Sequence, residues 1–533
     1  MSDRTAITFD LLAKTENEAA VRVLTAALES RFVELRDMAI GAILSRHSSN
    51  GHRALLQRLH LLPEECRSRI RKSNSQMTQA LRDMILETDK QICTNGCEAV
   101  LWFNEYDLIP ALINAVTDQA NPNVELAGRT LMSLIESLYT ELASPGKVRA
   151  RRDPQLLREH TITALESGVQ RYSQHRQREV VESFLLLANR DNVVLKQILN
   201  DPRHPAFVVT IDILSKSERG GIIRLLLALL DDPHSPSAAL SVIGNRYDQR
   251  FMKFLLKKIG REPSKATSRN LKRIESIGWL GNSARVIDQL DDAGQHSMVK
   301  YVMASGVRRQ TAFGVIEHLL QHGRTQGRRA AAEALAEFNG ARANALTLTC
   351  LHDEDPIVQA NAISQLRSRG IPGSLSRLVD MLDSEETVVR RAVQESLSEF
   401  NFQRFLGAFD MLEEDVRHST GMLVKKVDPN VVPLLTAEMQ SPMRTRRMRA
   451  LQVARTVEMV EQLETSIITM LHDENHLIRA EAALTLAHSP TELSRAALRV
   501  ALQDSSTTVQ EAAQRALETL DRSEMLPSGA GGE

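Results

Sequence analysis

Two short segments of the sequence combine histidine with carboxylates, the side chains that bind iron or zinc. Residues 352–355 read HDED and residues 472–476 read HDENH. Imidazole and carboxylate groups are suitable ligands for both metals. A shared metal centre would require the fold to bring the two segments together. The distance between them therefore decides whether this chemistry is available.

Two further pairs have a spacing that places both members on one face of a helix. His318 and His322 are four residues apart, but Leu319 stands where a zincin-type H-E-x-x-H motif requires glutamate. Cys93 and Cys97 have the same spacing, and no second Cys or His pair lies close by to complete a zinc site. We interpret the histidines as part of a polar face and the cysteines as reduced structural thiols. We therefore expect no metal ligands, no cofactor and no catalytic residues.

Basic side chains are concentrated between residues 250 and 273. Two groups at helical spacing are separated by Gly260 and Pro263, and they include Arg250, Lys253, Lys257, Lys258, Lys265, Arg269, Lys272 and Arg273. Two neighbouring helices with basic faces are able to bind a phosphate backbone or an acidic partner. The whole chain has 66 basic and 67 acidic side chains, however, and a net charge of −1. This balance favours the alternative that these residues are solvated and paired with acids on neighbouring elements.

A second basic run and an aromatic cluster are the other candidate contact sites. The run comprises Arg444, Arg446, Arg447 and Arg449, to which the same alternative applies. Trp102 lies in the segment LWFNEYD. It is a candidate anchor for a partner, although a core contact or a contact between repeats explains it as well.

The elements that position these residues follow from a repeated pattern. Leucine recurs every 31 residues at 320, 351 and 382, and again at 471 and 502. A small or apolar residue follows at +7, Arg or Gln at +8, Ala or Val at +11 and usually Leu at +15. A fixed period of this size indicates a repeat array.

Each repeat has the composition of two short helices joined by a polar turn. Ile478, Ala482 and Leu486 are spaced four apart and share one helical face. Asp355-Pro356 and Ser441-Pro442 have the residue types of helix starts. No segment shows the sustained alternation of a strand, so we predict an all-α fold. The Asp at +2 and the Arg at +8 are expected to bond across adjacent turns. As exposed pairs they would set the register and contribute only about 0–1 kcal/mol each.

The pattern L-x-D-x(4)-V/I-R-x-x-A-x(3)-L, clearest at 320–400 and 471–520, resembles the HEAT-like repeat family, in particular the short type named for phycobilin lyases. This resemblance implies a right-handed α-solenoid of stacked antiparallel helix pairs. The same family includes deoxyhypusine hydroxylase, whose His-Glu dipeptides hold iron, and this sequence contains no His-Glu dipeptide. The HDED and HDENH segments occupy equivalent positions about four repeats apart, too distant to share one metal. We therefore expect them to cap helices.

Sequence features also predict the organisation of the chain. We expect N-terminal helical repeats, a basic linker or long loop, degenerate repeats, regular repeats and a disordered tail, at residues 1–140, 141–155, 156–310, 311–521 and 522–533 respectively. The start of the sequence lacks the pattern of a signal peptide. The longest apolar run, 222–230, is short and contains Arg224. A cytoplasmic location without membrane association is the resulting expectation.

These features predict a non-enzymatic scaffold or adaptor that presents an extended surface to a protein or peptide. Solenoids expose a long face lined by successive helices, and no group of residues indicates a small-molecule substrate. Nucleic-acid binding through the segment 250–273 is the alternative. A tetrapyrrole- or metal-linked enzyme of the lyase or hydroxylase type is the second alternative, although no lyase residue maps onto this sequence.

Overall fold

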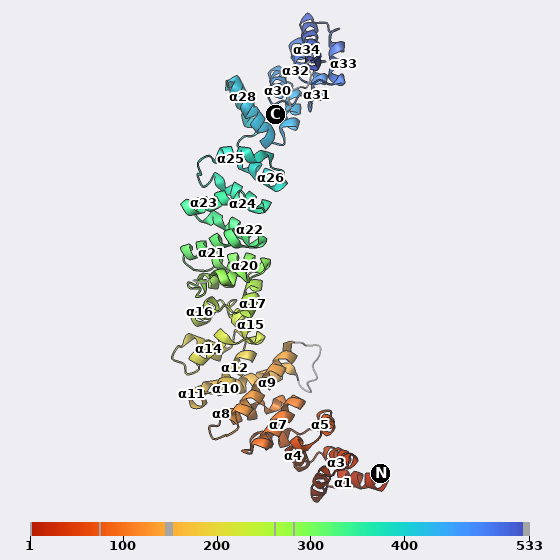
Figure 1. Ribbon diagram of the computed structural model, residues 1–533, viewed down its shortest axis with the longest axis vertical. Coiled ribbons are helices and arrows are strands. Elements are labelled where there is room, and N and C mark those ends of the chain that lie inside the picture. Colours follow the sequence, from red (N-terminus) through yellow and green to blue (C-terminus); the bar gives the residue numbers. More distant parts are fainter. Residues whose placement is uncertain (1–2, 74–75, 144–152, 261–262, 281–282, 526–533) are drawn as a thin grey trace. The chain divides into compact units, whose positions relative to one another are not determined.

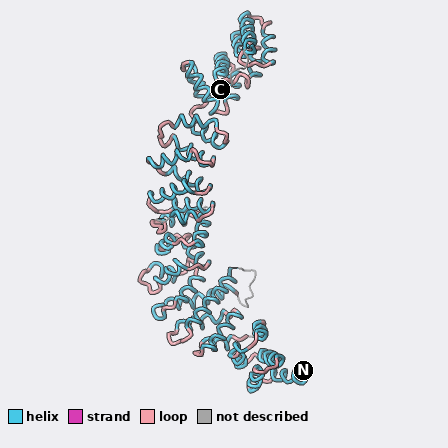
Figure 2. The backbone as a smooth tube through the Cα atoms, viewed as in Figure 1, coloured by secondary structure: helices cyan, strands magenta, loops and turns pink. Residues whose placement is uncertain are grey.

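A computed structural model describes residues 3–73, 76–143, 153–260, 263–280 and 283–525. Helices and their connections account for all of this structure, and these ranges contain no strand (Figures 1 and 2). The prediction of an all-α solenoid fold is confirmed. The right hand of the superhelix stays a prediction.

The chain divides into two compact units, Met1–Val315 and Ile316–Glu533. The described helices of the first unit are α1 (Asp3–Lys14), α2 (Ala19–Leu28), α3 (Val33–Arg46), α4 (Ser49–Gln57), α5 (Glu64–Arg71), α6 (Thr78–Ile85), α7 (Lys90–Phe103), α8 (Ile109–Thr117), α9 (Val124–Ala143), α10 (Pro154–Gln170), α11 (Tyr172–His175), α12 (Arg178–Leu187), α13 (Val193–Asn200), α14 (Phe207–Lys216), α15 (Gly220–Leu229), α16 (Ser237–Asn245), α17 (Gln249–Ile259), α18 (Lys265–Lys272), α19 (Ser283–Asp288) and α20 (Asp292–Ala304).

Helix α21 (Arg309–His322) crosses the boundary between the units. The second unit continues with α22 (Thr325–Ala334), α23 (Ala341–Cys350), α24 (Pro356–Leu366), α25 (Ser374–Asp380), α26 (Thr387–Ser396), α27 (Phe402–Ala408), α28 (Glu414–Val427), α29 (Val431–Met439), α30 (Arg444–Thr456), α31 (Glu464–Met470), α32 (His476–Leu486), α33 (Glu492–Ala501) and α34 (Thr507–Met525). Short 3-10 helices occur at Leu59–Leu61, Tyr106–Leu108, Leu335–Glu337, Met381–Asp383 and Phe409–Met411.

The core of the second unit consists of the apolar positions of the repeat. Ile478, Ala482 and Leu486 on α32 are fully buried, as their spacing predicts. They pack between helices because α32 contacts both α30 and α34. Alanine at +11 leaves room for this close approach of neighbouring helices.

One of the two predicted helix starts is confirmed and the other is wrong. Asp355 caps α24 by accepting a hydrogen bond from the Ile357 amide at 2.8 Å, with Pro356 in the first turn. Ser441-Pro442 was expected to start a helix, but α30 begins at Arg444. Ser441 instead belongs to the turn, where its carbonyl accepts a hydrogen bond from Arg447 at 2.9 Å.

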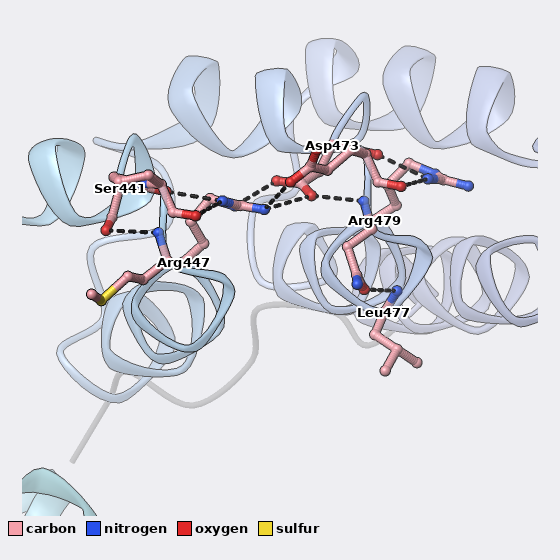
Figure 3. Close-up of polar contacts among 9 residues, drawn as sticks. Ser441, Arg447, Asp473, Leu477 and Arg479 are labelled. Carbon is pink, nitrogen blue, oxygen red and sulfur yellow. Dashed lines mark hydrogen bonds and ion pairs between the residues drawn. The ribbon is translucent and has the colours of Figure 1, made fainter.

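The Arg and Asp residues of the repeat form a ladder between successive turns, as predicted (Figure 3). Arg447 Nε lies 2.8 Å from Asp473 Oδ2, and Arg479 Nε lies 2.8 Å from Asp504 Oδ2. Arg328 pairs with Asp353 in the same way at 3.0 Å. The expectation that these pairs are exposed was wrong. Their side chains are only 9–14% exposed.

The residue at +8 also closes its own turn. Arg479 Nη1 donates to the Asp473 carbonyl, six residues earlier, at 2.8 Å. Gln359 and Gln510 make the equivalent bond to the carbonyls of Asp353 and Asp504, each at 2.6 Å. Arg479 therefore connects its turn to the next repeat, whereas Gln359, Gln510 and also Arg390, which donates to the Ser384 and Glu385 carbonyls, bond within their own turns.

In the first unit, α9, α12, α15, α17 and α20 follow one another as direct neighbours (Figure 1). We call these five helices the α9–α20 row.

A glycine on α15 permits a close approach to the side chains of its neighbours α9 and α12. A Cβ added to Gly221 would lie 2.5 Å from Leu186 Cδ1 and 2.9 Å from Tyr139 Cζ. Glycine at this position leaves room for the Leu186 and Tyr139 side chains between α15 and its neighbours α12 and α9.

Two of the predicted segment boundaries fall near the limits of the described residues. Most of the segment 141–155 lies outside them, and α9 ends at Ala143 while α10 begins at Pro154. Helix α34 extends to Met525, four residues into the segment for which we predicted a tail. The remainder of that segment lies outside the described residues.

Candidate binding groove

A solvent-open groove of about 960 Å³ lies along the α9–α20 row. Its walls come from α9, α12, the turn before α15, and the first residues of α15 and α17. Most of the lining side chains are polar or charged. Small-molecule pockets are usually enclosed and mainly apolar, so this groove has the character of a contact surface.

An arginine bridge crosses the centre of the groove. Arg219, immediately before α15, donates from Nε to Glu182 Oε1 of α12 at 2.9 Å and also pairs with Glu136 of α9. The Ser217 hydroxyl lies 3.4 Å from the same Glu182 oxygen. Burial raises the pKa of Glu182 and lowers that of Arg219. The bridge joins three elements, and its one arginine compensates one of the two glutamates, so the cluster keeps one negative charge.

Beyond this bridge, one side of the groove is basic. Arg224 of α15 is exposed and donates from Nη1 to the Tyr139 hydroxyl at 3.2 Å. Arg250 of α17 lines the same groove. A Cβ added to Gly220 would lie 3.6 Å from Arg250 Nη2, so the guanidinium reaches the start of α15. Neither arginine makes an ion pair with a carboxylate of the described residues.

The cationic stripe continues along α17. Lys253 and Lys257 follow Arg250 at i+3 and i+7, which places the three residues on one helical face. Both lysines are exposed, and within the described ranges neither has an ion-pair partner. The prediction that Arg250, Lys253 and Lys257 share one face is therefore confirmed.

The remaining basic residues of segment 250–273 lie in other environments. Lys258 pairs with Asp231 at 2.5 Å, and Arg273 Nη1 donates to the Ser235 carbonyl at 2.9 Å. Lys265, Arg269 and Lys272 line a separate hollow of about 380 Å³ with Pro263 and Ser268, which we call the α18 hollow. The groove and this hollow share no lining residue.

The second basic run is paired with acids of neighbouring elements. Arg447 belongs to the ladder, Arg449 Nη2 lies 2.5 Å from Asp410 Oδ2, and Arg446 lies 3.8 Å from Glu438. The structural alternative stated for this run is confirmed at these three positions.

Trp102 is half-buried on α7. The Arg71 guanidinium lies over its ring, 4.6 Å from the centroid. This contact joins α7 to α5, which is the inter-repeat alternative considered for this residue. A role for Trp102 as a partner anchor stays a prediction.

The residues considered for metal chemistry have structural contacts. Asp353 and Asp355 of the HDED segment pair with Arg328 and Arg329, and Asp473 of the HDENH segment pairs with Arg447. Cys93 and Cys97 are buried free thiols. Across the described ranges, no group of three or more His, Cys, Asp or Glu side chains is arranged to hold a metal.

Sequence reasoning missed the groove itself. Glu136, Tyr139 and Glu182 are far from Arg219 and Arg224 in sequence, and their residue types follow no motif. The one available signal was Arg224, a charge inside the apolar run 222–230. A charge there implies a helix with one solvent-facing side.

The comparison with family models confirms the repeat type. Residues 314–398 match HEAT repeats. This segment is part of the stretch in which the 31-residue period is regular, and the HEAT-like assignment is confirmed for these residues. No curated protein matches the sequence.

Solved structures with similar folds are helical-repeat proteins of low sequence identity. A chain from a study of the phosphorylation-switched interaction between cadherin and beta-catenin is 12% identical, with a TM-score of 0.38, over 95% of this chain and 99% of that one. Importin beta is 12% identical, with a TM-score of 0.27, over 97% and 82%. Human deoxyhypusine hydroxylase is 16% identical, with a TM-score of 0.19, over 51% and 96%.

The helices were also compared with the requirements of a membrane span. None of those in the described part of the chain combines enough length with enough apolarity to cross a membrane.

Proposed function

We propose that this protein is a scaffold or adaptor that binds a segment of another protein in the groove of the α9–α20 row. The observation that carries the proposal is the construction of the groove. It is open, polar and built from successive helices of the row. This is the kind of surface by which solenoids make extended contacts.

The dimensions of the row are suitable for a polypeptide. From α9 to α17 there are three steps between neighbouring helices, each about 8–10 Å. An extended chain rises about 3.3 Å per residue. A segment of about eight or nine residues would therefore cross the groove, with its polar backbone near the exposed Ser133 and Thr140 of α9.

Site-specific photo-crosslinking tests this proposal. We would place p-benzoylphenylalanine at Ser133, which is exposed and lines the groove, and irradiate a nuclease-treated lysate of the source cells. The matched control carries the same group at Val208 of α14, which is 74% exposed and lies outside the groove lining. We expect a discrete protein adduct at position 133 and none at 208. Equal adducts at both positions, or no protein adduct, would refute the proposal.

The α18 hollow supports nucleic-acid binding as a second candidate function. Lys265, Arg269 and Lys272 line it, and no acidic residue does. Phosphate contacts made by lysine and arginine weaken steeply with salt. Binding of a labelled oligonucleotide should therefore fall between low and physiological salt and be lost in a Lys265→Glu, Lys272→Glu double variant. Unchanged binding in that variant would reject this segment as the site.

A cytoplasmic location is part of the proposal. It rests on cysteine usage in the sequence, because four cysteines in a chain of 533 residues do not form a disulfide framework. Fractionation of the source cells with an antibody to the full chain would test it.

A further inference from the structure

The charges that remain unpaired in the groove indicate what kind of segment it accepts. We infer that the groove of the α9–α20 row binds an acidic peptide segment of a partner protein, with its carboxylates over α15 and α17. This inference rests on the proposed function, because it specifies the chemistry of the partner at the same site.

The first step is the balance of charges that the protein does not neutralise itself. Arg219 is paired with Glu136 and Glu182 and compensates one of these two carboxylates, so the bridge itself keeps one negative charge. Four cations remain without a carboxylate partner among the described residues, and they are grouped on adjacent helices: Arg224, Arg250, Lys253 and Lys257.

The second step is the local potential at the basic side. The Arg250 guanidinium reaches the start of α15, where no side chain caps the helix. The N-terminal end of a helix carries partial positive charge. It therefore adds to the potential of the arginines. A carboxylate at this place would meet favourable charge from two helices and would compensate the repulsion between Arg224 and Arg250.

The third step distinguishes a peptide from a nucleic acid. Glu141 and Glu218 also line the groove, in addition to the two bridged glutamates. A polyphosphate chain carries a charge on every unit and would be repelled along this side. A peptide can carry its acidic residues over α15 and α17 and neutral residues elsewhere. The groove thus favours an acidic peptide, whereas the α18 hollow has no such carboxylates.

Fluorescence anisotropy with defined probes tests the inference on the full-length protein. The first probe is a fluorescein-labelled twelve-residue peptide with glutamates in one half and serines in the other. In the second and third probes glutamine or lysine replaces glutamate, and the fourth is a twelve-nucleotide oligothymidylate. We expect the acidic peptide to bind more tightly than the glutamine and lysine peptides, with an affinity that decreases as salt screens the charges.

Two double variants with the same change in net charge locate the site. Arg224→Gln with Arg250→Gln removes two groove cations, and Lys265→Gln with Lys272→Gln removes two cations of the α18 hollow. All four side chains are exposed, so both proteins should keep the wild-type circular dichroism and melting temperature. We expect about a tenfold loss of acidic-peptide affinity in the groove variant, from two partly shielded ion pairs, and little change in the control.

The outcomes separate this inference from the proposed function. Equal binding of the glutamic-acid and glutamine peptides, no peptide binding, or equal losses in the two variants would overturn the inference. Tighter binding of the oligonucleotide, lost in the groove variant, would overturn it in favour of nucleic acid. If crosslinking at Ser133 identifies a partner whose crosslinked segment is not acidic, the proposed function stands and the inference fails. If no protein crosslinks there, both fail.

Discussion

Replacement of Arg479 by glutamine should loosen the end of the second unit by a predictable amount. Arg479 makes a two-pronged ion pair with Asp504, with nitrogen–oxygen distances of 2.8 and 2.9 Å, and a separate bond to the Asp473 carbonyl. Glutamine at the equivalent positions 359 and 510 makes only the carbonyl bond. Arg479→Gln should therefore remove the connection between repeats and keep the turn. Arg479→Met should remove both.

The burial of the pair sets the size of the effect. Breaking a fully buried ion pair by removing one partner costs about 3–5 kcal/mol, and an exposed pair contributes about 0–1 kcal/mol. Both side chains here are 14% exposed. Each repeat is one helix pair thick, so solvent lies close beyond the covering atoms and screens the charges. We therefore expect a loss of about 2 kcal/mol for Arg479→Gln, and about 1 kcal/mol more for Arg479→Met.

Hydrogen exchange measured by mass spectrometry on the full chain is the appropriate assay, because a multi-unit solenoid need not unfold in one step. A loss of 2 kcal/mol corresponds to an exchange rate about 30-fold faster in α33 and α34. Peptides of the first unit serve as the internal control. A double-mutant cycle with Asp504→Asn should give most of the loss as coupling between the two residues.

The pH dependence supplies an independent check. Hydrogen bonding from Arg479 is the largest cause of the lowered pKa of Asp504, below the ordinary value of 3.8. The stability from the pair is thus full above pH 3.8 and is lost as pH falls through the lower pKa of the folded state. This acid sensitivity should be reduced in Arg479→Gln. An exchange rate in α34 within threefold of wild type, or equal rates in the Gln and Met variants, would refute the reasoning.

Two further predictions concern the first unit. Gly221→Ala should lower the melting temperature, because its Cβ would lie 2.5 Å from Leu186 Cδ1 and such overpacking costs about 1–3 kcal/mol. The control Gly220→Ala, whose Cβ has no contact closer than 3.6 Å, should leave the melting temperature unchanged. Equal effects of the two substitutions would contradict the argument from the close approach at Gly221. Burial, and secondly the nearby His47, lowers the pKa of His52 below 6.5. The unfolded chain then binds a proton that the folded chain does not, so protection of α4 should fall as pH decreases below 6.5; a His52→Phe variant that keeps the same pH dependence would show that another group is responsible.

The helical repeat was predictable because its signal is local and periodic. Ile478, Ala482 and Leu486 had to share a face from their spacing alone, and all three are buried. The ladder followed from the same register, since Arg at +8 and Asp at +2 recur in successive units. Its burial did not follow, because Arg479 and Asp504 lie 25 residues apart in the sequence and meet only when successive turns stack.

The groove, in contrast to the helical repeat, could not be predicted from the sequence. Glu136, Glu182 and Arg219 come from three separate elements, and nothing in their local sequence indicates that one arginine bridges both carboxylates. The composition of the sequence revealed the basic segment 250–273. It did not reveal that Arg250 lines the groove while Lys265 lines the separate α18 hollow. Such groupings depend on which helix faces become neighbours after stacking.

The sequence by itself determined that this chain is an all-α array of helical repeats, with HEAT repeats at residues 314–398, because helix periodicity, capping and the 31-residue register are properties of contiguous residues. Only the tertiary structure decided which charges are neutralised and which remain available to a partner. The reason is physical: an ion pair depends on distances of a few ångströms between side chains that stacking brings together. An arginine placed beside a carboxylate is paired within the protein, whereas an arginine without such a neighbour is free to bind a partner.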